Sequence, residues 1–470
     1  MQLNLLAPEI VLALLGLILL VLGLILPHKG KSVMSAMAFL GLLLAFILSI
    51  SLFGKEQALF NGIYQVDNYG NFFKILFFTA GFLVILSGES YIKRFDKRCH
   101  EFYGFLVFAL LGMTVMASAN ELLTLYIGLE LMTISFYILT AYLQSSELSV
   151  EAGLKYLILG AISSAVLLFG VSLVYAVSGT TIISEIAQNI RLEPALIAGI
   201  ILMLAGFAFK VSLVPFHMWA PDIYQGAPIP ITAFLAVGSK AAAIAAFVRV
   251  FVIAFDLPQF DWGLILAVLA AITIVVGNLI ALAQTDIKRL LAYSSIAQAG
   301  YIMVGMAAGN TLGLKGVLFY AMLYVFSNMG AFAVATAVEV ETKSTSIAAF
   351  NGLGRRSPMM AAIMTVCLLS LAGIPPLAGF VGKFYLFSGA IQAGYLWLAF
   401  VGLIMSMVSV YYYLMVAKAM YIDSNYESMS EIKPLASTQL ALWICLAGTI
   451  LIGIYPAPLS ALAQAAVGLF

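Results

Sequence analysis

Two lysines lie inside neighbouring apolar segments of the chain, where a charge is costly. Lys210 occurs in segment 195–219 and Lys240 in segment 228–254, and each segment is long enough to cross a bilayer. A charge at the bilayer centre costs about 2.5–3.5 kcal/mol on insertion scales, so such lysines usually serve a function. Pro215 interrupts the first segment, which an unbroken helix would not tolerate. This combination predicts ion movement across a membrane.

Three further ionisable residues accompany these lysines. Glu130 and Lys383 also lie within apolar segments, and His217 follows Lys210 by seven residues, beside the predicted helix break. A carboxylate stays ionised beside a lysine and binds a proton in apolar surroundings, whereas burial lowers the proton affinity of a lysine. The five residues therefore suit a proton relay. Two structural alternatives remain: Glu130 pairs with a lysine of another segment, or His217 bonds a backbone carbonyl that a proline has freed.

A polar stripe follows one face of the apolar segment 287–308. Ser294, Gln298 and Tyr301 are spaced by four and three residues, so a helix would place them on one face. Such a face could line a water path. Because serine and alanine also allow two helices to approach closely, helix packing is the favoured interpretation.

The composition is that of a polytopic membrane protein. Hydrophobic residues make up 63% of the chain and charged residues 9%, against roughly 25% charged residues in soluble domains. The formal net charge of +1 gives no indication of a nucleic-acid partner. The three cysteines are far apart, without the spacing of a metal or iron–sulfur site, so we expect no cofactor in this chain.

The apolar segments predict an all-α protein with fourteen transmembrane helices. We place them at residues 4–26, 33–53, 72–90, 102–119, 121–143, 152–177, 195–219, 228–254, 262–283, 287–308, 314–338, 358–391, 395–421 and 437–458. The twelfth segment is too long for one helix and contains Pro375 and Pro376, so we expect two half-helices joined at membrane depth. The connections are too short for a soluble domain, so any redox centre belongs to another polypeptide.

The two broken helices, seven and twelve, are five helices apart. Helices 4–8 and 9–13 are therefore predicted to form two five-helix bundles of inverted orientation, a recurring plan in transporters. The predicted parts are residues 1–101 with helices 1–3, residues 102–254 with the first bundle, residues 262–421 with the second bundle, and residues 437–470 with helix 14.

Lysine and arginine are distributed unequally between the two sides of the predicted membrane protein. One side carries Lys29, Lys31, Lys93, Arg94, Lys97, Arg98, Lys288, Arg289, Lys343, Arg355, Arg356, Lys418 and Lys433. The other side carries only Lys55, Arg191 and Lys315. Cytoplasmic loops are enriched in these residues, so both termini are predicted on the outer face.

Three long motifs resemble one family of membrane proteins. LVPFHMWAPDIYQGAPIPITAFLAVGSKAA, QTDIKRLLAYSSIAQAGY and LSLAGIPPLAGFVGKFYLF are similar to the antiporter-like subunits of proton-pumping NADH:quinone oxidoreductase (respiratory complex I), which are related to Mrp-type cation/proton antiporters. The resemblance runs from about Phe102 to Tyr421. It is greatest to the N-type subunits, because Lys383 stands where M-type subunits tend to carry glutamate and no long lateral helix of the L type follows helix 14.

The resemblance implies a role for each of the five ionisable residues. Glu130 matches the glutamate of helix five, Lys210 the lysine of helix seven, Lys240 the central lysine of helix eight, Lys383 the ionisable residue of helix twelve, and His217 the histidine of the PFH motif. It implies a non-redox subunit that moves protons in a bacterial plasma membrane. Its expected partners are lipid, other membrane subunits, and a peripheral arm that holds FMN and iron–sulfur clusters.

Two other functions remain open at the level of sequence. The first is a subunit of an Mrp-type Na⁺/H⁺ antiporter complex that uses the same lysines. The second is a membrane scaffold that only anchors its neighbours. A scaffold would account for the fourteen helices but not for charges in the middle of helices beside two helix breaks.

Overall fold

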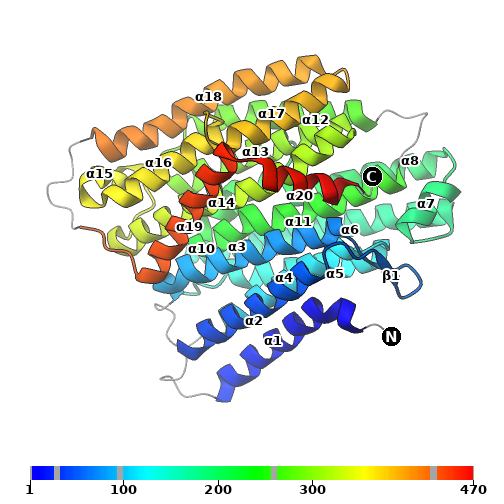
Figure 1. Cartoon of the computed structure of the whole chain (residues 1–470), viewed down its shortest axis with the longest axis horizontal. Coiled ribbons are helices and arrows are strands. Elements are labelled where there is room, and N and C mark those ends of the chain that lie inside the picture. The colour runs from blue at the N-terminus through cyan, green and yellow to red at the C-terminus, as the bar shows by residue number, and fades with distance from the viewer. Residues whose placement is uncertain (1–2, 26–31, 93–98, 256–261, 424–430, 469–470) are drawn as a thin grey trace.

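The fold is a bundle of long helices that run side by side, as a computed structural model shows (Figure 1). The structure describes residues 3–25, 32–92, 99–255, 262–423 and 431–468. Helices α1 and α2 lie at one edge of the bundle and α18 lies at the opposite edge (Figure 1). Six of the basic residues used for the orientation, Lys29, Lys31, Lys93, Arg94, Lys97 and Arg98, lie outside the described residues.

The N-terminal part contains three long helices and one short hairpin. Its elements are the 3-10 turn Leu3–Leu6, α1 (Ala7–Ile25), α2 (Ser32–Ser51), β1 (Gln57–Leu59), β2 (Tyr64–Val66) and α3 (Asn68–Ile92). The two strands are antiparallel, and Leu59 lies opposite Tyr64. The prediction of an all-α chain is therefore correct except for this hairpin.

The first bundle follows the predicted order, with a break in its seventh span. Its elements are α4 (Cys99–Ser118), α5 (Leu122–Thr140), α6 (Glu147–Ser178), α7 (Ile183–Asn189), α8 (Pro194–Val211), α9 (Trp219–Gly226), α10 (Ile229–Phe234), η4 (Leu235–Ser239), α11 (Lys240–Val248) and η5 (Arg249–Ala254). Helix α8 ends before Ser212, which has a left-handed φ of 66°, and Pro215 follows in the break. Helices α10 and α11 with the two π-helical segments η4 and η5 form one continuous span.

The second bundle contains the other predicted break. Its elements are α12 (Trp262–Ala281), α13 (Ile287–Ala308), α14 (Thr311–Thr342), η6 (Ile347–Phe350), α15 (Leu353–Arg356), α16 (Pro358–Ala372), α17 (Ala378–Gln392) and α18 (Leu396–Tyr421). Helix α16 ends at Gly373, whose φ of 88° is in the left-handed region where glycine is favoured. The chain then passes Pro375 and Pro376 before α17 begins. Residues 358–391 are thus two helices, as predicted.

The C-terminal part differs from the prediction of a single helix. It contains α19 (Ala436–Ile454) and a second helix, α20 (Ala457–Val467), which packs against α3 and α14. Pro458 lies in the first turn of α20, where proline is favoured because the backbone N–H that it lacks would have no partner within the helix. A helix of eleven residues is too short to cross a bilayer, so α20 adds no span.

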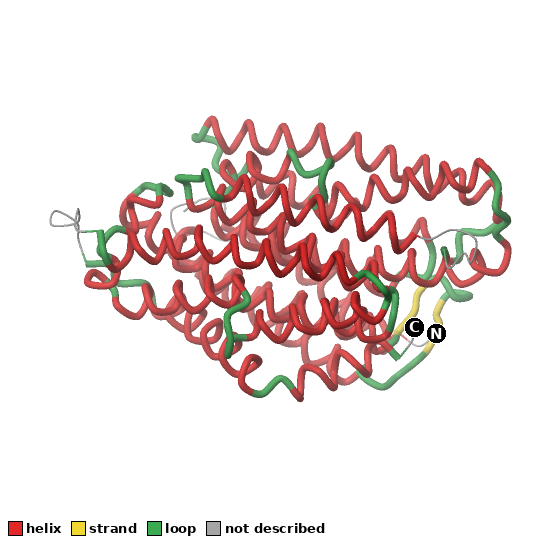
Figure 2. Tube along the Cα trace, turned by 90° about the horizontal axis from the view of Figure 1, so that it is seen from above, coloured by secondary structure: helices red, strands yellow, loops and turns green. Residues whose placement is uncertain are grey.

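The number of spans agrees with the prediction. In the described ranges, thirteen helices are long and apolar enough to cross a membrane, and α16 with α17 forms one further, broken span. Both chain ends and the β1–β2 hairpin lie at the same end of the bundle (Figures 1 and 2), as an even number of spans requires. The chain is therefore a multi-pass membrane protein. The inverted relation of the two bundles remains a prediction.

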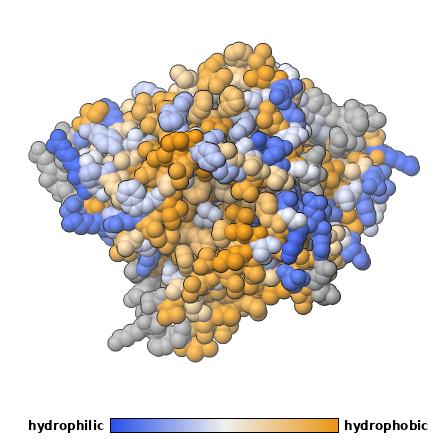
Figure 3. Space-filling view, in the orientation of Figure 1, coloured by the Kyte–Doolittle hydropathy of each residue, from blue (hydrophilic) through white to orange (hydrophobic). Residues whose placement is uncertain are grey.

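The most buried helices occupy the centre of the bundle. The span Ile229–Ala254 is fully buried, and α13 and α14 are nearly so, whereas less than half of α2, α6 and α18 is buried. Apolar residues cover the middle of the visible face and hydrophilic residues gather toward its two ends (Figure 3), which fits a belt of lipid around the bundle. Lys240 thus lies on the span that is farthest from lipid.

Candidate functional site

The lysine of the first broken span is buried among hydroxyl groups. Lys210 lies in the last turn of α8, and its Nζ donates to Thr133 Oγ1 at 3.4 Å on α5 and to Ser164 Oγ at 3.3 Å on α6. Glu130 lies one turn before Thr133 and interacts electrostatically with Lys210. Within the described residues Glu130 makes no ion pair within 4 Å, and its Oε1 has no hydrogen-bond partner. The predicted pair is therefore close but not in direct contact.

The central lysine lies on the fully buried span, directly after the π-helical segment Leu235–Ser239. Lys240 Nζ donates to Ser295 Oγ at 2.6 Å and to the Ser295 carbonyl oxygen at 3.0 Å, both on α13. A cavity of about 10 Å³ beside it, also lined by Gln298 and Tyr324, has room for about one water molecule. π-Helical turns are frequent at functional sites because they redirect side chains from the helical ladder. Lys240 is thus held by neutral oxygen atoms next to a small cavity.

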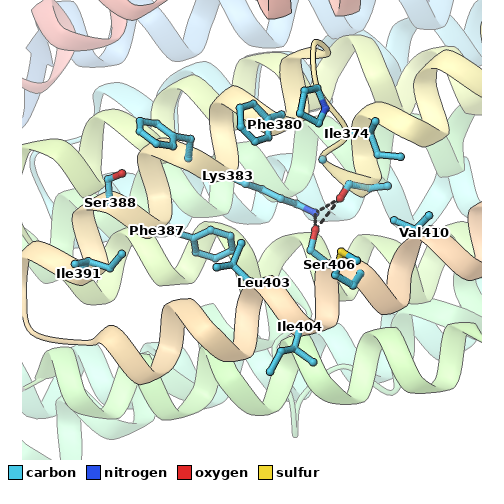
Figure 4. Close-up of a pocket in the computed structure, with 15 residues that line it drawn as sticks. Ile374, Phe380, Lys383, Phe387, Ser388, Ile391, Leu403, Ile404, Ser406 and Val410 are labelled. Atoms are coloured by element: carbon cyan, nitrogen blue, oxygen red, sulfur yellow. Dashed lines mark hydrogen bonds between the residues drawn. The ribbon is translucent and has the colours of Figure 1, made fainter.

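The lysine of the second broken span uses the backbone that the break leaves free. Lys383 Nζ on α17 donates to the carbonyl oxygens of Leu371 at 3.1 Å and Ala372 at 3.0 Å, and to Ser406 Oγ at 2.8 Å. The ammonium lies 4.3 Å from the centre of the Tyr301 ring, a cation–π distance. Figure 4 shows the side chain pointing from α17 toward Ser406 on α18, at the wall of an apolar cavity of about 550 Å³.

His217 lies in the break between α8 and α9 and is buried. Its imidazole is hydrogen-bonded to the backbone of Pro215. No hydrogen bond joins it to Lys210 or Lys240 in the part of the chain that the structure describes. The geometry corresponds to the structural alternative, in which a histidine satisfies backbone groups that a proline leaves free.

The polar stripe on α13 is buried between packed helices and forms a hydrogen-bonded network with them. Gln298 Nε2 donates to the Leu371 carbonyl at 3.0 Å, the same oxygen that binds Lys383. The Tyr320 hydroxyl donates to Gln298 Oε1 at 2.5 Å. Tyr301 accepts from Asn278 Nδ2 at 3.4 Å. The amide of Gln298 therefore touches both the cavity beside Lys240 and the oxygen that holds Lys383.

Two buried ion pairs were missed at the level of sequence. Lys74 Nζ on α3 lies 2.8 Å from Glu9 Oε1 on α1, and Arg249 Nη2 lies 2.9 Å from Asp67 Oδ2. Both cations are fully buried. The signal that could have found them is a basic residue in an apolar segment, because a buried charge requires a partner.

A cluster of charged residues joins the two bundles at one end of their spans. Asp222 on α9 binds Lys155 on α6 and Arg289 on α13, each at 3.0 Å. Partial burial alone would raise the pKa of Asp222, but the hydrogen bonds and charges of Lys155 and Arg289 outweigh it and hold the pKa below its usual value. Lys288 adds a bond from α13 to the Ala227 carbonyl at 2.6 Å. These contacts fix the end of the first bundle against the start of the second.

Comparison with known proteins identifies the family of this chain. Residues 119–409, more than half of the chain, match the family described as NADH:quinone oxidoreductase/Mrp antiporter, TM. The chain belongs to this family. A family member from Desulforamulus reducens, named NADH-quinone oxidoreductase subunit N, is 50% identical over 99% of this chain and 98% of its own length.

Solved structures of the NADH:quinone oxidoreductase/Mrp antiporter family share the fold. A chain of respiratory complex I from Thermus thermophilus is 34% identical, with a TM-score of 0.85 over 97% of this chain and 99% of its own. A chain of an Mrp complex from a Dietzia species has a TM-score of 0.89 over 99% of this chain and 97% of its own. At 20% identity, the likeness to the Mrp chain concerns the fold alone.

Proposed function

We propose that this chain is the proton-translocating, antiporter-like membrane subunit of an NADH:quinone oxidoreductase. The observation that carries the proposal is the set of three buried lysines, Lys210, Lys240 and Lys383. Each is held by neutral oxygen atoms, and none has a carboxylate within 4 Å among the described residues. The similarity to proteins named subunit N supports the assignment to this complex.

Lysines in this setting are suited to exchange protons. Burial disfavours the charged form, and without a carboxylate in contact little offsets that cost. In the proposed route, water on the inner side delivers a proton through the first bundle to Lys240. The Glu130–Lys210 pair then closes or opens and so changes the proton affinity of Lys240. Lys383 passes the proton toward the outer side, and His217 takes part at the entry if its contact with Pro215 is released.

The energy for this movement comes from partner subunits. Moving one charge against 100 mV takes about 2.3 kcal/mol, whereas a shift of one pKa unit supplies about 1.4 kcal/mol. Several coupled groups must therefore change together. The chain itself carries out no bond chemistry in this proposal. FMN and iron–sulfur clusters belong to the peripheral redox arm, and the other contacts are membrane subunits and lipid of a bacterial plasma membrane, with both termini on the outer face.

The second candidate is a subunit of an Mrp-type Na⁺/H⁺ antiporter complex. The similarity of fold to the Dietzia chain favours it. However, the sequence identity to that chain is much lower than the identity to the relative named subunit N. Purification separates the two functions. Flavin and iron–sulfur subunits that co-purify with the chain indicate the oxidoreductase, and a complex of membrane subunits alone indicates the antiporter.

Substitution of the central lysine tests the proposed function. We expect Lys240→Ala to abolish NADH-driven proton uptake into inverted membrane vesicles, because no other described side chain can take over the role of Lys240 at this place on the fully buried span. Complex assembly and electron transfer to an artificial acceptor should be retained. The matched control is Lys315→Ala, since Lys315 lies near the start of α14 and is only partly buried. Normal uptake in an assembled Lys240→Ala complex would contradict the proposal.

A further inference from the structure

Two tyrosines of α18 lie between the sites of Lys240 and Lys383. The Tyr413 hydroxyl is hydrogen-bonded to Ser294 Oγ and accepts from Gln298 Nε2 at 3.4 Å. Ser294 precedes Ser295, the residue that binds Lys240, and Gln298 lines the cavity beside Lys240. Tyr413 thus contacts Gln298, a residue that lines the cavity beside Lys240.

The neighbouring tyrosine reaches the other lysine. The Tyr412 hydroxyl donates to Asn278 Oδ1 at 3.0 Å, and Asn278 Nδ2 donates to the Tyr301 hydroxyl at 3.4 Å. Lys383 lies over the Tyr301 ring, and both residues bind Ser406. The hydroxyls of Tyr412 and Tyr413 are bonded to each other, and their ring centres are 4.4 Å apart. The tyrosine pair therefore completes a polar connection between the two lysine sites.

Hydroxyl and amide members of this connection differ in chemistry. A hydroxyl oxygen both accepts and donates, so it takes a proton on one side, releases its own on the other, and ends unchanged. An amide accepts at oxygen and donates at nitrogen, so it orients its neighbours without passing a proton between them. Gln298 and Asn278 are therefore suited to hold the tyrosines in place, and the tyrosines are suited to carry the proton.

We propose that Tyr413 and Tyr412 carry protons from the Lys240 site to the Lys383 site. This inference rests on the proposed function. One proton leaves the Lys240 ammonium, each hydroxyl on the way gains one proton and loses one, and the neutral amine of Lys383 receives one. Gln298 lies between the Lys240 cavity and the Tyr413 hydroxyl, and Asn278 lies between the hydroxyls of Tyr412 and Tyr301. Transfer at each of these two points requires the amide to move aside. A fixed amide at either point prevents leak when the partner subunits are idle.

The sequence offers a matched control, because Tyr411, Tyr412 and Tyr413 are adjacent on α18. Tyr411 is 60% exposed, whereas the other two are buried. The variants Tyr411→Phe, Tyr412→Phe and Tyr413→Phe each keep the ring and remove one hydroxyl. We expect Tyr413→Phe to lose most of the proton uptake per NADH oxidised, and Tyr412→Phe to lower it in the same direction. Tyr411→Phe should match the unmodified protein. Complex content and NADH oxidation with an artificial acceptor are measured on the same vesicles.

A second variant separates proton transfer from packing. Tyr413→Ser removes the ring but keeps a hydroxyl and leaves room for water, so proton transfer predicts more uptake per NADH than in Tyr413→Phe. A role in packing alone predicts the reverse order. Wild-type uptake in Tyr413→Phe, or a lower ratio in Tyr413→Ser than in Tyr413→Phe, would overturn the inference.

Lys240→Ala measured alongside shows which proposal fails. Normal uptake in Lys240→Ala would overturn the proposed function. Lost uptake in Lys240→Ala with normal uptake in Tyr413→Phe would overturn only the role of the tyrosines.

Discussion

Two regions of the molecule bury cations in opposite ways. Near the β1–β2 hairpin, Lys74 and Arg249 are fully buried and lie 2.8 and 2.9 Å from the carboxylates of Glu9 and Asp67. Along the polar connection at the centre of the bundle, Lys240 and Lys383 are almost as buried, yet their partners are hydroxyl and carbonyl oxygens. The two pairs of cations are therefore similarly buried, but only the first pair has carboxylates in contact that compensate its charge.

The difference separates structural cations from those that can exchange protons. A carboxylate in contact stabilises the charged form, so a paired lysine or arginine keeps its proton and holds two helices together. A buried lysine with only neutral acceptors gains less from its charge, and small electrostatic changes nearby decide whether it is protonated. Burial alone does not indicate a relay residue, and it is burial without a carboxylate partner that supports the proposed role of Lys240 and Lys383.

The largest effect is expected where an ion pair is broken. Asp67→Asn leaves the Arg249 guanidinium charged and uncompensated, which costs about 3–5 kcal/mol in a buried pair. We expect the subunit to lose thermal stability and the complex to lose assembly, as measured by the melting temperature and by native gel electrophoresis. The double variant Asp67→Leu with Arg249→Met removes both charges and should regain most of the loss. A stable, assembled Asp67→Asn protein would contradict the structural role.

A carboxylate placed beside a relay lysine should convert it into a paired cation. Ser406 Oγ lies 2.8 Å from Lys383 Nζ, so Ser406→Asp places an acid within reach of the ammonium. The pair would hold the proton on Lys383, and we expect proton uptake per NADH to fall while assembly is kept. Ser406→Asn has nearly the same size without the charge and is the control. Equal proton uptake per NADH in Ser406→Asp and Ser406→Asn would show that a carboxylate partner does not decide whether a buried lysine exchanges protons.

Removal of one neutral acceptor should have a moderate effect. Ser295→Ala takes away the hydroxyl that accepts from Lys240, but the Ser295 carbonyl at 3.0 Å remains. A hydrogen bond to a charged group is worth about 1.5–3 kcal/mol, so the protonated form of Lys240 becomes less favourable. We expect slower pumping and a pH–rate profile whose upper limb shifts to lower pH. An unchanged profile would exclude this hydroxyl from the control of Lys240.

The smallest effect is expected at the exposed cluster around Asp222. Its carboxyl pKa is held low by Lys155 and Arg289 despite the opposing effect of burial, so its stabilising contribution is present above its unfolded pKa of about 3.9. That contribution is lost as pH falls through the lower folded pKa. Because the side chains are partly exposed, Asp222→Asn should cost at most about 1 kcal/mol, measured by thermal unfolding above pH 5. The difference in the free energy of unfolding between Asp222→Asn and the unmodified protein should shrink below pH 4.

The features predicted correctly from the sequence depend on local rules. The bilayer requires about twenty apolar residues for each span, so the segments themselves give the order of the helices. Proline ends a helix wherever it occurs, which is why the breaks near Pro215 and Pro375 were expected. A lysine in the middle of an apolar segment is costly in any fold, and this cost identified Lys210, Lys240 and Lys383. The hairpin and α20 carry no comparable signal because both are short.

Only the tertiary structure decided which residues meet. Arg249 and Asp67 are 182 positions apart in the chain, and Tyr413 and Ser294 are 119 positions apart. Hydrophobic periodicity states which face of a helix is buried, but not which helix lies against it. The sequence by itself therefore determined the number of spans, their breaks and the lysines in the middle of spans. The packing of the helices determined whether each charge meets a carboxylate or a neutral oxygen, because that depends on residues brought together from distant segments.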